Sequence, residues 1–346
     1  MNPALYSLFL LTLFSSTLIT LASNHWLLAW LGLELNTLAV LPLISSPHHP
    51  RATEATTKYF MAQTTASTII LLTGTITAWH TGQWTISNLT PPSTTVLLIA
   101  AIMLKLGTAP LHFWYPDVLQ GSTMPTALII STWQKLAPLA LLYMTLYTTP
   151  PNLLLMLGFL SITIGGWTGL LHTQTRKLMA CSSIGHMGWL LVALVLNPKL
   201  ATLTLMIYLL MTSAIFITLT STEAKTITDI GTIWPHTPPQ ATLTAMTLLS
   251  LGGLPPMTGF APKWLIIKDL TLHHLTPLAT TLALLSLPAL YFYVRLTYFT
   301  TLTTPPTTHT TTLLWRLPPQ APLTVTLPAI LTIFMLPLMP TLYNTM

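Results

Sequence analysis

Charge is scarce in this sequence. Of the 346 residues, 12 are Lys or Arg and 6 are Asp or Glu, whereas 52% are hydrophobic. The apolar residues form runs of the length that crosses a bilayer, about 20 residues for one helix. A backbone in hydrocarbon must satisfy its own hydrogen bonds, so such runs favour helices. The composition therefore excludes an ordinary soluble domain and predicts an all-α, polytopic bundle of transmembrane helices.

Cysteine and the common cofactor motifs are also missing. The single cysteine, Cys181, excludes an intrachain disulfide, a cysteine-ligated cluster and a zinc finger built from this chain alone. The sequence contains no Walker loop, no dinucleotide fingerprint and no haem-attachment motif. His48 and His49 are adjacent and point apart on a helix, which disfavours a metal site. We therefore expect no cofactor in this chain, and any redox chemistry must occur elsewhere.

About eleven hydrophobic segments follow one another along the chain. They span roughly residues 3–21, 25–45, 57–79, 94–115, 123–147, 152–171, 178–196, 200–222, 240–268, 277–299 and 322–342. The separators are rich in turn-forming residues, and the longest, "TLTTPPTTHTTTLLWRLPPQ", is expected to be an extended surface loop. No separator is long enough for a soluble domain, so we predict a single membrane domain over residues 1–346.

The basic residues are scattered over short loops and do not form the cluster typical of nucleic-acid binding. If the segments alternate across the membrane, the positive-inside rule places the N-terminus inside. On that side lie Arg51, Lys58, Arg176, Lys177, Lys225, Arg295 and Arg316, against Lys199 and Lys268 on the other. The first residues resemble neither a transit peptide nor a cleaved signal, so we expect the first helix to be retained.

Four ionisable residues lie well inside apolar segments: Glu34, Lys105, Lys135 and Lys263. A charge at the centre of a membrane helix costs roughly 2.5 to 3.5 kcal/mol. These side chains are therefore expected to face the interior of the bundle, where water or an opposite charge offsets that cost. For any single lysine, snorkelling to the interface or a structural ion pair is an equally good explanation.

Pairing accounts for only part of this set. Glu34 is able to pair with Lys105, which leaves Lys135 and Lys263 with no acidic residue inside the membrane. Burial favours the neutral form of an unpaired lysine, so such a group is suited to take up and release protons. His186 and His112 are further candidates for a proton relay, although a packing role explains each of them as well.

Two of the apolar segments are predicted to be broken helices. Proline removes a backbone donor, and the freed groups are tolerated in a membrane only where protein or a water-filled cavity receives them. Interrupted segments at corresponding places in two halves are typical of transporters with inverted repeats. An ordinary proline kink is the alternative for either segment. The residues are Gly107 and Pro110 near Lys105, and Gly252, Gly253, Pro255 and Pro256 before Lys263.

Several stretches carry a resemblance that runs nearly end to end. They include "NHWLLAWLGLELNTLAVLPLI", "KLGTAPLHFWYPDVLQG", "GGWTGLLHTQTRKLMACSSIGHMGW" and "SLGGLPPMTGFAPKW". They resemble the NADH dehydrogenase subunit 2 family of respiratory complex I, whose members are related to Mrp-type cation/proton antiporters. The resemblance implies that Glu34 and Lys105 match a carboxylate–lysine pair, Lys135 a central lysine, Lys263 a terminal lysine, and His186 a polar residue on the connecting axis.

The same resemblance implies a role. The chain would be a proton-translocating membrane-arm subunit of the mitochondrial inner membrane, with its N-terminus in the matrix. NADH, FMN, iron–sulfur clusters and ubiquinone would be bound by partner subunits, and the partners would be other membrane-arm subunits, accessory subunits and lipids such as cardiolipin. Many bacterial relatives carry three further N-terminal helices that have no counterpart here. A self-contained cation/proton antiporter and a non-pumping membrane scaffold are the alternatives.

Overall fold

The computed structural model describes residues 3–86, 92–222, 224–231, 233, 238–301 and 323–345. Across these ranges the secondary structure is helical apart from two isolated β-bridges, so the all-α prediction is confirmed. Arg316 and nearly all of the long Thr/Pro-rich separator lie outside the described residues. The chain divides into two compact units, Met1–Leu160 and Ser161–Met346. That both belong to a single membrane domain stays a prediction.

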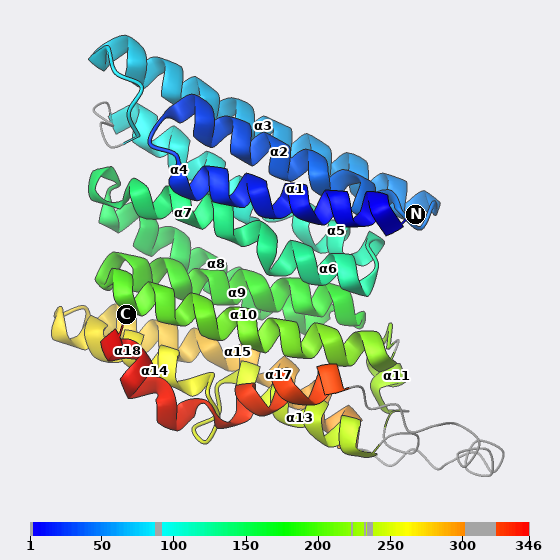
Figure 1. Cartoon of the computed structure of the whole chain (residues 1–346). Coiled ribbons are helices and arrows are strands. Elements are labelled where there is room, and N and C mark those ends of the chain that lie inside the picture. Colours follow the sequence, from blue (N-terminus) through cyan, green and yellow to red (C-terminus); the bar gives the residue numbers. More distant parts are fainter. Residues whose placement is uncertain are drawn as a thin grey trace. The chain divides into compact units, whose positions relative to one another are not determined.

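The first unit is built from helices that pack side by side (Figure 1). Helix α1 packs on α2 and α2 on α3, while α3 also contacts α4 and α5, and α7 contacts both α1 and α4. The elements are α1 (Pro3–Ala22), α2 (Trp26–Ser45), α3 (Pro50–Thr81), α4 (Pro92–Leu106), α5 (Trp114–Gly121), α6 (Met124–Ser131), η1 (Trp133–Lys135), α7 (Leu136–Met144), η2 (Leu146–Thr148) and the first half of α8 (Pro151–Leu171).

The second unit has its own core around α10. That helix contacts α9, α13, α14 and α17, and α15 packs against α11, α13 and α14. The elements after α8 are α9 (Thr175–Leu196), α10 (Pro198–Thr222), α11 (Ile227–Gly231), α13 (Pro238–Gly252), α14 (Phe260–Leu272), α15 (Thr276–Thr301), α17 (Leu323–Phe334), η4 (Leu336–Leu338) and α18 (Met339–Thr345).

The eleven predicted segments all correspond to helices or helix pairs. In the described part of the chain, seven helices are long and apolar enough to cross a membrane, one of them the run Met124–Met144 formed by α6, η1 and α7. A pair bent by 59° at residue 335 makes an eighth if it is taken as one span. The other three segments are α3, which is rich in threonine, and the pairs α4 with α5 and α13 with α14. These pairs are interrupted, so neither member alone reaches the length of a span.

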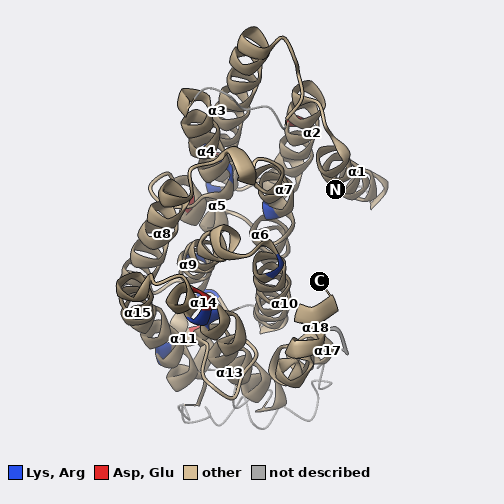
Figure 2. Cartoon of the chain, turned by 90° about the vertical axis from the view of Figure 1, so that its left-hand side faces the viewer, with Lys and Arg blue, Asp and Glu red and all other residues tan. Residues whose placement is uncertain are grey.

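The many hydroxyl groups bond to their own helices, as in Thr20 Oγ1, which donates to the carbonyl of Thr17 at 2.7 Å. This removes free polar groups from surfaces that face hydrocarbon. Imidazoles cap two helices: His25 Nδ1 accepts from Leu27 N–H before α2, and His49 Nδ1 accepts from Arg51 N–H before α3. Charged residues are sparse over both units (Figure 2).

Candidate functional site

The first predicted break is a true interruption of the helix. Helix α4 ends at Leu106, and α5 does not begin until Trp114. Gly107 follows α4 with a φ of 66°, a left-handed conformation that is costly for any residue with a side chain. Pro110, in the segment between the helices, cannot supply a backbone donor to continue the ladder. The prediction of a broken helix is confirmed, and a simple proline kink is excluded.

Donors around this break satisfy the last carbonyl groups of α4. Leu104 O accepts from Trp114 Nε1 at 3.0 Å as well as from Gly107 N–H, and Lys105 O accepts from Gln63 Nε2 at 3.3 Å. The groups freed by the break are thus received by protein, which is the condition for irregular backbone inside a membrane. All of these donors are uncharged, so the break does not use the ammonium group of Lys105.

The structure buries both candidate lysines of the first unit. Lys105 is 5% exposed and Lys135, at the end of η1, is 2% exposed. Neither Nζ atom has a hydrogen-bond acceptor among the described residues. Lys135 Nζ instead lies over the aromatic ring of Tyr115, 4.4 Å from the ring centroid. Snorkelling to the interface is therefore excluded for both side chains.

Glu34 does not form the direct ion pair that the sequence suggested. Within the described residues, the ion pairs shorter than 4.0 Å are those of Lys58 with Glu54 and with Asp117, both at 2.8 Å. The Oε2 atom of Glu34 is buried without a hydrogen-bond partner among the described residues. The carboxylate and the ammonium group of Lys105 are thus not joined by a direct contact.

Several polar residues of this cluster were missed by sequence reasoning. Tyr59 donates to Gln134 Oε1 at 3.3 Å, and Gln134 Nε2 donates to Asn36 Oδ1 at 3.1 Å. This row links α3, α2 and the turn that carries Lys135. The only sign of these residues in the sequence is an uncharged amide or phenol inside an apolar segment. Such a group costs less in hydrocarbon than a charge and therefore points less strongly to a functional site. His112 lies in the break itself, 6% exposed, with its ring centroid 4.4 Å from that of Phe113 and the two rings tilted by 31°.

The second predicted break has the same plan, and it too is confirmed. Helix α13 ends at Gly252, Gly253 has a φ of 80°, and α14 begins at Phe260. Pro255 and Pro256 lie between the two helices. Here a charged group caps the helix end: Lys263 Nζ donates to the carbonyl of Gly252 at 2.8 Å. The two breaks therefore differ in how they use their lysine.

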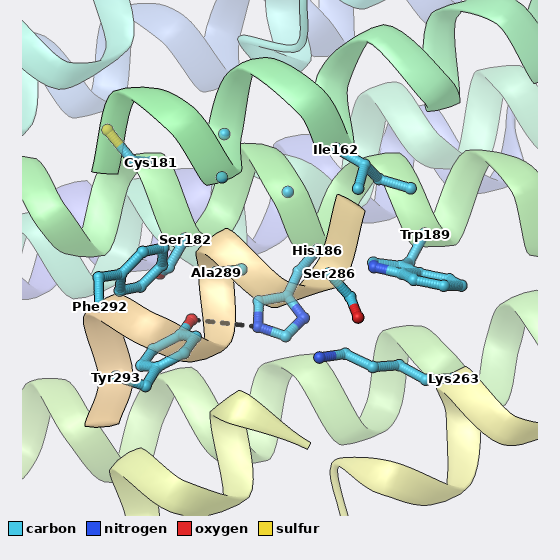
Figure 3. A pocket seen from close by; sticks show the side chains of 13 residues that line it. Ile162, Cys181, Ser182, His186, Trp189, Lys263, Ser286, Ala289, Phe292 and Tyr293 are labelled. Atoms are coloured by element: carbon cyan, nitrogen blue, oxygen red, sulfur yellow. Dashed lines mark hydrogen bonds between the residues drawn. The ribbon is translucent and has the colours of Figure 1, made fainter. Parts of the chain in front are cut away.

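Lys263 shares a small cavity with His186 in the second unit. The cavity, of about 20 Å³, is also lined by Ser286 and Tyr293, and Figure 3 shows the Lys263 ammonium and the imidazole pointing into it. Tyr293 Oη lies 3.3 Å from His186 Nε2. A second cavity of similar size is also lined by both His186 and Lys263. Each is large enough for about one water molecule and has polar partners for it, so the pair is suited to exchange protons through water.

Two other residues singled out in the sequence are His49, which lies apart from these clusters, and Cys181, which lines the cavity shared by His186 and Lys263. His49 caps α3, as described above, and Cys181 is buried with its sulfur accepting from Thr168 Oγ1 at 3.4 Å. Among the described residues, no group of three His, Cys, Asp or Glu side chains is arranged to hold a metal ion. Five of the predicted site residues thus fall into two groups, Glu34, Lys105 and Lys135 in the first unit, and His186 with Lys263 in one cavity of the second.

Comparison with known proteins places this architecture in a family. Residues 23–287 match the family described as NADH:quinone oxidoreductase/Mrp antiporter, TM, and residues 290–343 match NADH dehydrogenase subunit 2 C-terminus. The NADH-ubiquinone oxidoreductase chain 2 of Tetraodon nigroviridis is 50% identical over 349 residues, covering 99% of this chain and 100% of the relative. This chain belongs to the NADH-ubiquinone oxidoreductase chain 2 family. The family member from Coturnix japonica is 49% identical and covers 98% of each chain.

Solved structures show that the antiporter-like fold of this chain 2 family is shared more widely. A chain in respiratory complex I from Thermus thermophilus superposes with a TM-score of 0.88 at 24% identity, covering 99% of this chain and 80% of that one. A chain of the Mrp complex from Dietzia has a TM-score of 0.84 at 16% identity, covering 97% of this chain and 75% of that one. Both likenesses concern the fold alone.

Proposed function

We propose that this chain is a membrane-arm subunit of respiratory complex I that moves protons across the mitochondrial inner membrane, driven by electron transfer from NADH to ubiquinone in partner subunits. The observation that carries this proposal is the burial of Lys105 and Lys135 without a hydrogen-bond acceptor among the described residues. A purely structural charge would normally be paired, because an unpaired buried charge is costly. Membership of the chain 2 family supplies the reaction to which the transfer is coupled.

The proposed mechanism is electrostatic. A change in the interaction between Glu34 and Lys105 alters the repulsion that Lys105 exerts on a proton at Lys135. His186 and Lys263 form the corresponding transfer site of the second unit, with Lys263 as the terminal lysine toward the intermembrane space. Moving one charge against 100 mV takes about 2.3 kcal/mol. This chain has no cofactor of its own in the proposal, so NADH, FMN, iron–sulfur clusters and ubiquinone in partner subunits supply that energy.

The proposed surroundings follow from the surface and the charges. Large exposed apolar side chains such as Leu11 and Phe14 on α1 suit lipid, cardiolipin included, or neighbouring membrane-arm and accessory subunits. The N-terminus is proposed to face the matrix. In support, most of the basic residues fall on the side of the N-terminus if the segments alternate across the membrane.

The test is the number of protons moved per NADH oxidised in reconstituted complex that carries Lys135→Met. We expect lost turnover or a lowered ratio, after normal assembly has been confirmed. Lys199→Met, at an exposed position at the start of α10, is the matched control and should behave as wild type. Unchanged turnover and ratio in Lys135→Met would leave the chain a scaffold. Pumping by the isolated chain under an ion gradient would instead favour a self-contained antiporter.

A further inference from the structure

The ring of Tyr115 lies between the first helix break and Lys135. Tyr115 is the second residue of α5 and is 1% exposed, and Lys135 Nζ is 4.4 Å from the centre of its ring. A cation within about 6 Å of an aromatic ring centroid is attracted by the negative face of the ring, and the attraction is strongest when both groups are removed from water. Lys135 Nζ has no hydrogen-bond acceptor among the described residues. The ring of Tyr115 is therefore the partner that stabilises its ammonium group.

The break itself sets the position of the ring. A Cβ atom at Gly107 would stand 3.0 Å from Tyr115 Cβ and 3.1 Å from Cγ, so the missing side chain is what admits the tyrosine. Tyr115 N–H donates to the carbonyl of His112 at 3.0 Å, and the Trp114 indole N–H holds the end of α4. The first turn of α5 is therefore fixed against the same glycine that interrupts the helix.

No carboxylate is hydrogen-bonded to Lys135 in the part of the chain that the structure describes. The titratable groups on the elements around its turn include Lys105 on α4, Tyr143 on α7, Glu34 on α2 and Tyr59 on α3, whereas α6 carries none. Asp117 on α5 and Glu54 on α3 are both paired with Lys58. Lys105 repels a proton at Lys135, and of the acids Glu34, Glu54 and Asp117 only Glu34 has no ion pair among the described residues. The face of Tyr115 offers the ammonium a partner that adds no net charge.

We propose that Tyr115 is a positioning residue for Lys135, and that the face of its ring holds the protonated ammonium in place during proton transfer. The inference rests on the proposed function, because it assigns a supporting role within the same transfer site. It concerns the ring and not the hydroxyl group: phenylalanine retains an aromatic face, whereas leucine fills the space without one.

The experiment compares Tyr115→Phe and Tyr115→Leu with Lys135→Met in reconstituted complex, measuring proton pumping and turnover as functions of pH. We expect Tyr115→Phe to follow wild type. Tyr115→Leu should lose turnover roughly three- to tenfold at the alkaline end, with that limb displaced to lower pH by roughly half to one unit. Phe216→Leu on α10, where the aromatic side chain is 1% exposed, controls for the loss of a buried ring and should not move the profile.

The outcomes separate the two proposals. A wild-type profile in Tyr115→Leu, with pumping lost in Lys135→Met, overturns the role of the ring and leaves the proposed function standing. A loss in Tyr115→Phe equal to that in Tyr115→Leu overturns it as well, because the hydroxyl group would then be responsible. Normal pumping in Lys135→Met would contradict the proposed function. If Tyr115→Leu fails to assemble, Tyr115→Met provides the same comparison, and a wild-type profile there also overturns the role.

Discussion

The ammonium group of Lys263 caps the broken end of α13 by donating to the carbonyl of Gly252 at 2.8 Å. The last carbonyl groups of a helix have no partner within the helix and carry partial negative charge, so a cation there is stabilised. In the second unit, the candidate proton carrier Lys263 is thus also the residue that caps the helix break. In the first unit the carbonyl of Lys105, one residue before the end of α4, accepts from the neutral amide of Gln63.

Gly253→Ala should damage this arrangement. The residue has a φ of 80°, and an added Cβ would stand 2.9 Å from Lys263 Nζ. We expect a conformational cost of about 1–2 kcal/mol together with displacement of the lysine, seen as lower thermal stability of the complex and reduced proton pumping. Gly252→Ala is the matched control, because the nearest atom to its Cβ is 3.7 Å away. Equal behaviour of the two variants would contradict the prediction.

Tyr293→Phe should slow proton transfer in the second unit. It removes the hydroxyl group that lies 3.3 Å from His186 Nε2, leaving the ring in place. A hydrogen bond of this kind contributes about 0.5–1.5 kcal/mol, so we expect turnover to fall roughly two- to tenfold. Coupled NADH oxidation and proton uptake are the measurements. Tyr291→Phe on the same helix, with its side chain 61% exposed, should have no effect; a wild-type rate in Tyr293→Phe would show that the contact is incidental.

Asp117→Asn should loosen α5. Lys58 bridges Asp117 on α5 and Glu54 on its own helix α3, each at 2.8 Å. The first bridge joins two helices and the second stays within one, so Asp117→Asn should lower turnover and the melting temperature more than Glu54→Gln. Both carboxylates are partly exposed, and the difference should shrink in high salt. The reverse order, or a difference that salt does not change, would count against this account.

The loop before α11 should respond to acid through Asp229. Its Oδ2 atom accepts from Thr226 N–H at 2.8 Å and from Lys225 N–H at 3.0 Å. Partial burial acts to raise the pKa of Asp229, but these hydrogen bonds outweigh it and hold the pKa below its usual value. The stabilisation is therefore fully present above the unfolded value of about 3.9 and is lost as the pH falls through the lower, folded value.

Hydrogen exchange at the amides of Thr226 and Lys225 tests this sign. Protection, corrected for intrinsic exchange rates, should hold at pH 5 and decline toward pH 3. Asp229→Asn should reduce protection at both pH values and should remove most of the decline. Protection of these amides that increases as the pH falls in the wild type would contradict the prediction.

Much of the fold followed from composition and spacing. The scarcity of charge, the apolar runs and the glycine–proline clusters are properties of neighbouring residues, and the costs of charge and of free backbone groups in hydrocarbon make them decisive. For that reason the eleven segments, both breaks and the four charges inside apolar segments could be identified before the structure was known. The break at Gly107 and the break at Gly253 follow from local backbone geometry.

The sequence by itself determined that this protein is a membrane helix bundle, where its helices are broken and which charges it buries. Only the tertiary structure decided what those charges contact: Lys135 lies on Tyr115, Lys263 caps Gly252, and Lys105 has no direct ion pair with Glu34. The physical reason is that the partner of a long side chain depends on the packing of helices far apart in sequence. Helical periodicity and transfer cost are set locally and do not specify that packing.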